Sequence, residues 1–214
     1  KLIFSSSATV YGNQLNIPFK ENYPLNSINS YGSTKIIIEQ LISDYSKSNN
    51  SFKCISLRYF NPIGADLKTG LSDRPLGRSL NLIPILNHSI KHKKIFEIYG
   101  KNYNTKDGTC LRDFIHIKDL ANAHIIALKK INKIKGHEPI NLGLGKGISV
   151  LDIIKLYERV NNIKVNFKYS KKRKGDVAIS YADNKKAIKL LGWKPIYKYE
   201  DMVYDSWQAY LKNF

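Results

Sequence analysis

The chain of 214 residues, 43% of them hydrophobic and 11% aromatic, is long enough to bury the core of one large domain or two small ones. It has no apolar run of the roughly 18 residues that a membrane helix needs and no signal-peptide pattern, so we expect no membrane partner and a cytoplasmic location. The net charge of +18 is spread along the chain, with dense clusters only at 91–94 (KHKK) and 171–174 (KKRK), which favours a solvated basic surface and no nucleic-acid partner.

The first part of the chain alternates strands with a helix. A buried strand is expected at 1–6, a helix at 31–48 and a second strand, FKCISLRYF, at 52–60. The apolar residues of the helix recur near the helical period, and the second strand stops at Asn61 and Pro62, which cannot continue a ladder. Two strands joined by so long a crossover predict a parallel sheet.

Beyond Gly64 the pattern changes to a loop rich in Gly and Pro, followed by a helix from about 78 to 93. Short strands are expected after it, together with helices near 118–130, 149–160, 184–191 and 200–212. We therefore predict an α/β fold in which residues 1–64 form the C-terminal part of a Rossmann-like parallel sheet. Residues 65–214 would form mainly a smaller α/β substrate-binding lobe, with some segments returning to the first domain.

Glycine and cysteine spacings limit the cofactors that this chain can hold. A dinucleotide-binding fold normally opens with a strand and a G-x-G-x-x-G turn, whose helix N-terminus holds the pyrophosphate. The Gly-rich stretch of this chain, GLGKG at 143–147, comes late and lacks that spacing, so we expect the first half of the nucleotide-binding fold to be absent. Cys54 and Cys110 show no C-x-x-C or Cys/His spacing, and no metal site is predicted.

Tyr31 and Lys35, in YGSTK, are the first candidates for catalysis. Their spacing places both side chains on one face of a helix, one turn apart. A nearby ammonium favours the phenolate, so we expect Lys35 to lower the pKa of Tyr31 and make it a base. Ser7 directly follows the strand expected at 1–6, at the carboxyl edge where open α/β sheets bind ligands. The alternatives are a half-buried Tyr beside a solvated Lys, and serines that satisfy backbone groups in a turn.

Six segments together resemble the UDP-galactose 4-epimerases, which are extended members of the short-chain dehydrogenase/reductase family. They are, in chain order, SSSATVYG, SYGSTK, LRYFNPIGAD, DGTCLRDFIHIKDLA, NLGLGKGISV and RKGDVAISYAD. The resemblance implies NAD as cofactor and a UDP-hexose as substrate, interconverted between UDP-glucose and UDP-galactose, with the N-acetylated forms as further substrates. It also implies a homodimer when full length, while the chain by itself is expected to be inactive.

The resemblance assigns a role to each matching position. Tyr31 would take the proton of the sugar 4-hydroxyl, Ser7 would bond the 4-oxygen, and Lys35 would hold the nicotinamide ribose. Ser5 and Tyr59 would also contact the cofactor, together with Tyr31 and Lys35. The expected substrate contacts are Asn61, Asn81, Leu82, Ile98, Tyr99, Arg112, Arg173, Asp176 and Ser180. Guanidinium forks suit a diphosphate, although ordinary surface ion pairs are the alternative for the charged members.

Related dehydratases and decarboxylases are the nearest alternatives. A dehydratase needs a further acid and base, typically acidic residues directly after the catalytic Ser or Thr. Here Ala8, Thr9 and Val10 occupy that place, which favours epimerisation over elimination. A non-catalytic nucleotide-sugar-binding protein and a basic nucleic-acid-binding module are further alternatives.

Overall fold

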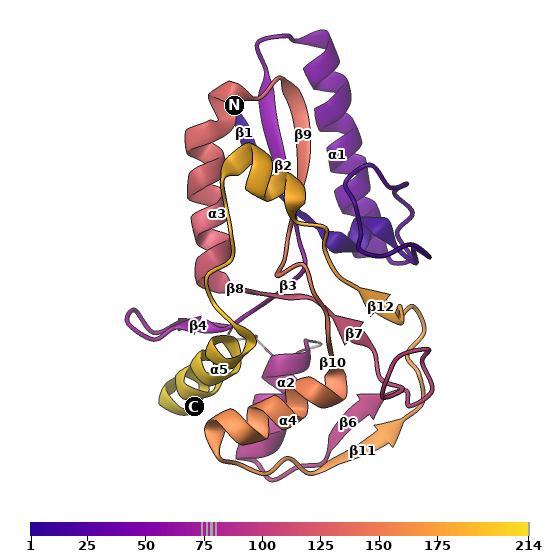
Figure 1. The fold of residues 1–214 in the computed structure, drawn as a ribbon, viewed down its shortest axis with the longest axis vertical. Coiled ribbons are helices and arrows are strands. Elements are labelled where there is room, and N and C mark those ends of the chain that lie inside the picture. The colour runs from indigo at the N-terminus through magenta and orange to yellow at the C-terminus, as the bar shows by residue number, and fades with distance from the viewer. Residues whose placement is uncertain (74, 76, 78, 80, 214) are drawn as a thin grey trace.

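The structure is a computed structural model, and it describes residues 1–73, 75, 77, 79 and 81–213. A three-stranded parallel sheet is formed by β1 (Leu2–Ser7), β2 (Lys53–Tyr59) and β9 (Gly136–Leu142), in the order β1-β2-β9. Figure 1 shows that helix α1 (Ser30–Ser48) lies on one side of this sheet and α3 (Ile117–Lys130) on the other. The predicted parallel α/β arrangement is confirmed.

The core of this part lies between the sheet and α3. Ala123 and Ala127 of α3 pack against Ile55 and Leu57 of β2 and against Ile140 of β9, and all five side chains are buried. Small residues on the helix let it approach the sheet closely, while β-branched and leucine side chains on the strands fill the space between them. Burial of this apolar surface is the main force that holds the helix on the sheet.

Strand β9 was not specified from the sequence, and its composition explains why. Its sequence GHEPINL begins with polar residues and has Pro139 in the middle, which argues against a central strand. Among the described strands β9 lies at the edge of the sheet, next to β2, where a missing N–H can be tolerated. A segment late in the chain thus returns to the sheet formed by the first strands.

The second lobe is built from helices and short strands (Figure 1). Its helices are α2 (Leu82–Lys91), α4 (Val150–Asn161) and α5 (Tyr199–Asn213), and its main strand pair is β6 (Phe96–Tyr99) with β11 (Phe167–Ser170). A second hydrophobic core holds Leu86 of α2, Ile153 of α4 and Met202 of α5 together. The remaining elements are η1 (Ala8–Tyr11), β3 (Asn61–Ile63), β4 (Ala65–Asp66), β5 (Leu71–Ser72), β7 (Leu111–Arg112), β8 (Phe114–His116), η2 (Ile131–Lys133), β10 (Ile148–Ser149), β12 (Ile179–Ser180) and η3 (Ala187–Leu191).

The predicted helices are present, with two differences. Helix α2 begins at Leu82, so Pro84 lies in its first turn, where its missing N–H would have no intrahelical partner anyway. Residue 78, where the helix was expected to start, lies outside the described residues. The helix expected at 184–191 is a short π-helical segment at Ala187–Leu191, which ends at Gly192 in the left-handed region. No helix in the described part is long and apolar enough to cross a bilayer.

A buried polar network joins β1, α1, β2 and β9 near the carboxyl ends of the strands. Glu39 and Arg58 are each 3% exposed and form an ion pair, with 2.5 Å between Nη2 and Oε2 and 2.9 Å between Nε and Oε1. Ser6 donates to Glu39 at 2.5 Å, and Arg58 donates to the Tyr11 hydroxyl at 3.0 Å. Tyr11 donates in turn to Asn141 at 2.6 Å. Each of these polar side chains therefore has a partner within the network, which fixes the strand ends relative to α1.

Candidate active site

A cavity of about 200 Å³ lies at the carboxyl ends of β1 and β2. Six of the residues predicted from the sequence line it, although they come from segments spread over most of the chain: Ser7, Tyr59, Asn61, Arg112, Asp176 and Ser180. Ser7 and Tyr59 are register partners at the ends of adjacent parallel strands. Such strand ends are where open α/β sheets bind their ligands.

Asn61 reaches the cavity because the chain changes sheets directly after β2. Phe60 N–H still donates to Leu142 in β9 at 3.0 Å, whereas Asn61 N–H donates to the Asp113 carbonyl at 3.2 Å. From Asn61 onward β3 pairs in parallel with β8. Asn61 therefore lies where the two lobes join.

Ser7 serves both as a turn residue and as a cavity residue. Its Oγ accepts hydrogen bonds from the backbone N–H and the hydroxyl of Thr9, at 3.2 Å and 3.0 Å. A hydroxyl oxygen that accepts two bonds directs its own proton toward another acceptor. The Tyr31 phenol lies near this hydroxyl, and interaction with Ser7 lowers the pKa of Tyr31, although its net shift is upward.

The structure differs from the expectation that Lys35 lowers the pKa of Tyr31. The Tyr31 side chain is 51% exposed, and its pKa is raised, first by partial burial and then by the nearby Tyr59. Lys35 lies on the same face of α1, with Nζ 5.5 Å from the Tyr31 ring centroid, but donates at 2.8 Å to the Ser5 carbonyl. The ammonium is thus held over the ring and not at the phenol oxygen.

Ser5 connects the two helices that flank the sheet. Its carbonyl accepts from Lys35 of α1, and its hydroxyl lies 3.1 Å from His124 Nε2 of α3. Because His124 Nδ1 donates to the Leu120 carbonyl at 2.9 Å, Nε2 is the acceptor and Ser5 is the donor. His124 was not predicted from the sequence, since no local spacing relates residue 124 of one helix to residue 5 of a distant strand.

Arg173, Asp176 and Tyr99 form a group beside the cavity. Arg173 Nε lies 3.0 Å from Asp176 Oδ2, and the guanidinium lies 4.7 Å from the Tyr99 ring centroid. Arg112 donates to the Leu111 carbonyl at 3.0 Å. The side chain of Ile98 is only 1% exposed and packs in the core of the second lobe, so a ligand contact at Ile98 could involve only its backbone.

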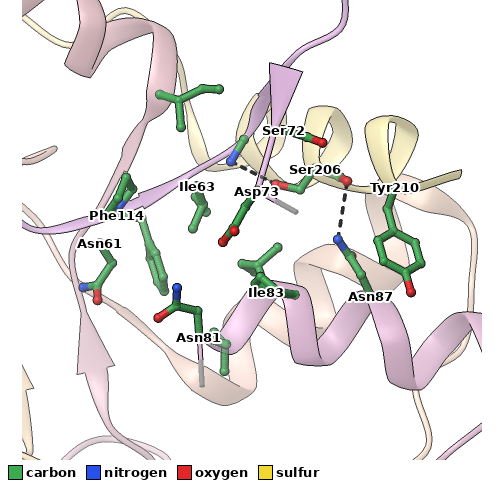
Figure 2. Close-up of a pocket in the computed structure, with 15 residues that line it drawn as sticks. Asn61, Ile63, Ser72, Asp73, Asn81, Ile83, Asn87, Phe114, Ser206 and Tyr210 are labelled. Carbon is green, nitrogen blue, oxygen red and sulfur yellow. Dashed lines mark hydrogen bonds between the residues drawn. The ribbon is translucent and has the colours of Figure 1, made fainter. Parts of the chain in front are cut away.

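Asn81 and Leu82 lie at a second cavity, of about 150 Å³, at the N-terminus of α2. Figure 2 shows Asn61 and Phe114 on one side of it and Asn87 with Ser206 on the other. Asn61 lines both cavities, so the two lie on either side of this residue. The Asn81 side chain makes no capping bond to α2, and the N–H groups of a first helical turn favour an anion.

Asp113 is a further residue near the site that sequence analysis did not single out. It lies between Arg112 and Phe114 and is fully buried. Burial raises the pKa of its carboxyl group, whereas the backbone N–H groups that donate to it lower the pKa. Within the part of the chain that the structure describes, no group of three or more His, Cys, Asp or Glu residues could hold a metal ion.

Several known proteins that are similar to this chain are UDP-glucose 4-epimerases. The chain is 42% identical over 97% of its length to a UDP-glucose 4-epimerase of Dictyostelium discoideum. It superposes with a TM-score of 0.95 and 37% identity on a UDP-glucose 4-epimerase from Stenotrophomonas maltophila with bound NAD and formylated UDP-arabinopyranose, covering 99% of this chain and 64% of that one. The TM-score is 0.92, at 40% identity, for the Bifidobacterium longum enzyme in complex with NAD+ and UDP, with 99% and 63% covered.

The chain spans 61% of the length of the Dictyostelium protein. Residues 1–143, more than half of the chain, match the family described as NAD dependent epimerase/dehydratase. The resemblance found in the sequence is therefore confirmed, and the sheet, the serine row and the Tyr-x-x-x-Lys helix all lie within the matched residues. The chain belongs to the NAD dependent epimerase/dehydratase family.

Proposed function

We propose that the full-length protein containing this chain interconverts UDP-glucose and UDP-galactose by epimerisation at carbon 4, with NAD as cofactor. One observation carries the proposal: the Ser7 hydroxyl, adjacent to Tyr31, shares a cavity with Asn61, Arg112 and Asp176. This combination offers a proton-handling pair at one end and groups suited to a diphosphate and a ribose at the other. In this proposal residues 1–64 belong to the cofactor-binding domain, and residues 65–214 mainly bind the UDP-sugar.

The residues at the carboxyl end of β1 fit the nicotinamide end of NAD. A lysine ammonium has three N–H donors, and Lys35 uses one of them on the Ser5 carbonyl. Its other donors and the half-exposed phenol of Tyr31 suit the hydroxyls of a ribose. When bound, NAD would supply the hydride acceptor and donor for carbon 4 of the sugar.

The protein's own part in the reaction is to hold the sugar and move one proton. Ser7 would donate its hydroxyl proton to the 4-oxygen, because its own oxygen is already held by Thr9. Tyr31 would accept the proton of the 4-hydroxyl as a phenolate and return it later. Arg112 and Arg173 would bind the diphosphate and so keep carbon 4 next to Tyr31.

The lining of the cavity argues against elimination chemistry. Among the described residues that line it, Asp176 is the only carboxylate, and it pairs with Arg173. Ala8 and Thr9, which follow Ser7, offer no carboxyl group. A dehydratase would need a further acid and base next to the sugar.

An assay of the full-length protein with UDP-galactose tests the proposed function. We expect UDP-glucose to form without net consumption of NAD. A dehydrated keto sugar would support a dehydratase, while UDP-sugar binding without turnover would support a non-catalytic binding protein.

Ser180 is proposed to admit substrates with an N-acetyl group. It lines the cavity from β12, and its small side chain leaves space that a tyrosine at this position would fill. Steric exclusion is a common basis of specificity. We expect the full-length protein to epimerise UDP-N-acetylglucosamine as well as UDP-glucose. Ser180→Tyr should abolish the activity on UDP-N-acetylglucosamine and keep the activity on UDP-glucose.

Product analysis with both substrates decides this prediction, and Ser180→Ala is the matched control that should keep both activities. A parent protein without activity on the N-acetylated sugar would contradict the assignment, as would a Ser180→Tyr variant that keeps it.

The outer face of α1 is proposed as the interface of a homodimer. Ile37, Leu41 and Tyr45 follow one another at intervals of four residues along α1, and each is more than half exposed. An apolar stripe of this kind on a helix suits packing against a second copy around a two-fold axis. Light scattering should give a dimer for the full-length protein and a monomer for Leu41→Glu. Leu128→Glu, an exposed site on α3, should leave the dimer intact.

A further inference from the structure

The carboxylate of Asp113 is buried in a cradle of backbone N–H groups. Its Oδ1 accepts from Leu144 at 2.8 Å, and its Oδ2 accepts from Gly145 and Ala182, each at 3.1 Å. Leu144 and Gly145 belong to the GLGKG turn after β9, whereas Ala182 follows β12. One side chain thus ties together two segments that lie about forty residues apart in the sequence.

The backbone N–H donors of the cradle require an acceptor atom at both ends of the Asp113 carboxyl group. A carboxylate can accept at two oxygens, but the amide of Asn would turn an NH₂ group toward one set of N–H donors. Either orientation of that amide leaves backbone donors buried without a partner, which is costly. Space is also limited, because a Cβ added at Gly143 would lie 2.3 Å from Asp113 Oδ2.

The main chain of Asp113 holds two residues of the substrate cavity. Its carbonyl accepts from the backbone N–H of Asn61 at 3.2 Å and from the Asn61 side-chain amide at 2.7 Å. Its N–H donates to the Ser180 carbonyl at 2.9 Å. Arg112, the third cavity residue, precedes Asp113 directly.

We propose that Asp113 is a positioning residue for the UDP-sugar cavity, which fixes Asn61, Arg112 and Ser180 against the turn at 143–147 and the segment after β12. This inference rests on the proposed function and deepens it, since it explains what holds the diphosphate-binding wall in place. Ser7, Tyr31 and Lys35 lie on β1 and α1 and make none of the bonds of the cradle. Asp113 therefore acts on substrate binding and leaves the proton-transfer step largely unchanged.

Asp113→Asn in the full-length protein is expected to weaken UDP binding and raise KM for UDP-galactose by roughly tenfold to a hundredfold, as expected for buried donors left unpaired. The kcat should stay within about threefold of the parent value, since the reacting groups are untouched. Isothermal titration with UDP and steady-state kinetics measure the two quantities. Asp205→Asn is the matched control: Asp205 bonds to buried His116 away from the cavity, so its loss should reduce stability without changing UDP affinity.

Gly143→Ala provides a second variant that leaves the carboxylate in place and pushes it off its donors; the same selective loss of UDP affinity is expected. UDP titration does not depend on turnover, so a parent that binds UDP without epimerising refutes the proposed function and leaves the role of Asp113 measurable. Parent-like UDP affinity in folded Asp113→Asn overturns the inference, and so does an equal loss in Asp205→Asn. If neither Asp113→Asn nor Gly143→Ala folds, the cradle serves global stability, and this result would also overturn the inference.

Discussion

Tyr31→Phe in the full-length protein is expected to lower the rate of the proposed UDP-galactose epimerisation by roughly a hundredfold to ten-thousandfold, the usual contribution of a positioned proton acceptor. The substitution removes one hydroxyl from a side chain that is 51% exposed and leaves the helix intact, so UDP affinity stays close to that of the parent. In the proposed mechanism this loss would report the absence of the group that takes the proton of the sugar 4-hydroxyl.

The pH dependence gives this prediction a second readout. In the proposed mechanism the active form of Tyr31 is the phenolate. In the structure burial and Tyr59 raise the pKa of the phenol, while Ser7 lowers it. The phenolate fraction increases with pH below that pKa, so the parent rate increases with pH until the phenol of the complete site is ionised. The residual rate of Tyr31→Phe should lack this dependence.

Tyr204→Phe on α5 is the matched control, because Tyr204 is similarly exposed, at 45%, and lines neither cavity. Rates measured with UDP-galactose for the parent and both variants decide the role of Tyr31. A Tyr31→Phe protein that turns over at the parent rate would show that another group takes the proton.

Glu39→Ala destabilises the protein by about 3–5 kcal/mol, which is the usual cost of removing one partner of a buried ion pair. The variant leaves the guanidinium of Arg58, itself 3% exposed, with only neutral oxygen partners, the Tyr11 hydroxyl and the Glu21 carbonyl. It also removes the acceptor of the Ser6 hydroxyl, next to Ser7. The free energy of unfolding is measured by urea denaturation.

The control is Asp44→Ala on the solvent side of the same helix, which removes the exposed pair with Lys47. Exposed pairs of this kind contribute little, so the urea midpoint should not change measurably. Equal midpoints for Glu39→Ala and the parent protein would show that the buried pair is not a net source of stability.

Local sequence patterns were sufficient to predict the elements in the first part of the chain. The apolar period of the segment around Ile42 predicts α1, and the run of β-branched and aromatic residues at 52–60 predicts β2, because each element buries one continuous set of side chains. The Tyr-x-x-x-Lys spacing likewise fixes Tyr31 and Lys35 on one helical face. These features depend on neighbours within a few turns or residues, and so they can be derived from the sequence.

Other elements depend on distant partners and could not be derived in this way. Strand β9 contains Pro139 and begins with polar residues, and only its pairing with β2 makes it a strand. The strands β7, β10 and β12 have two residues each, which is too short for any period to show. Their existence is decided by hydrogen bonds between segments that are close only in the folded chain.

The features of the candidate site also fall into those that follow from the sequence and those that depend on distant partners. The sequence by itself determined which residue types are present, in which order, and that Ser7 ends a strand and Tyr31 begins a helix. Only the tertiary structure decided that Lys35 bonds to the Ser5 carbonyl, that His124 bonds to Ser5 and that Asp113 bonds to the segments after β9 and β12. The physical reason is that hydrogen bonds and burial depend on distance in space, whereas local periodicity constrains only residues that are near in the chain.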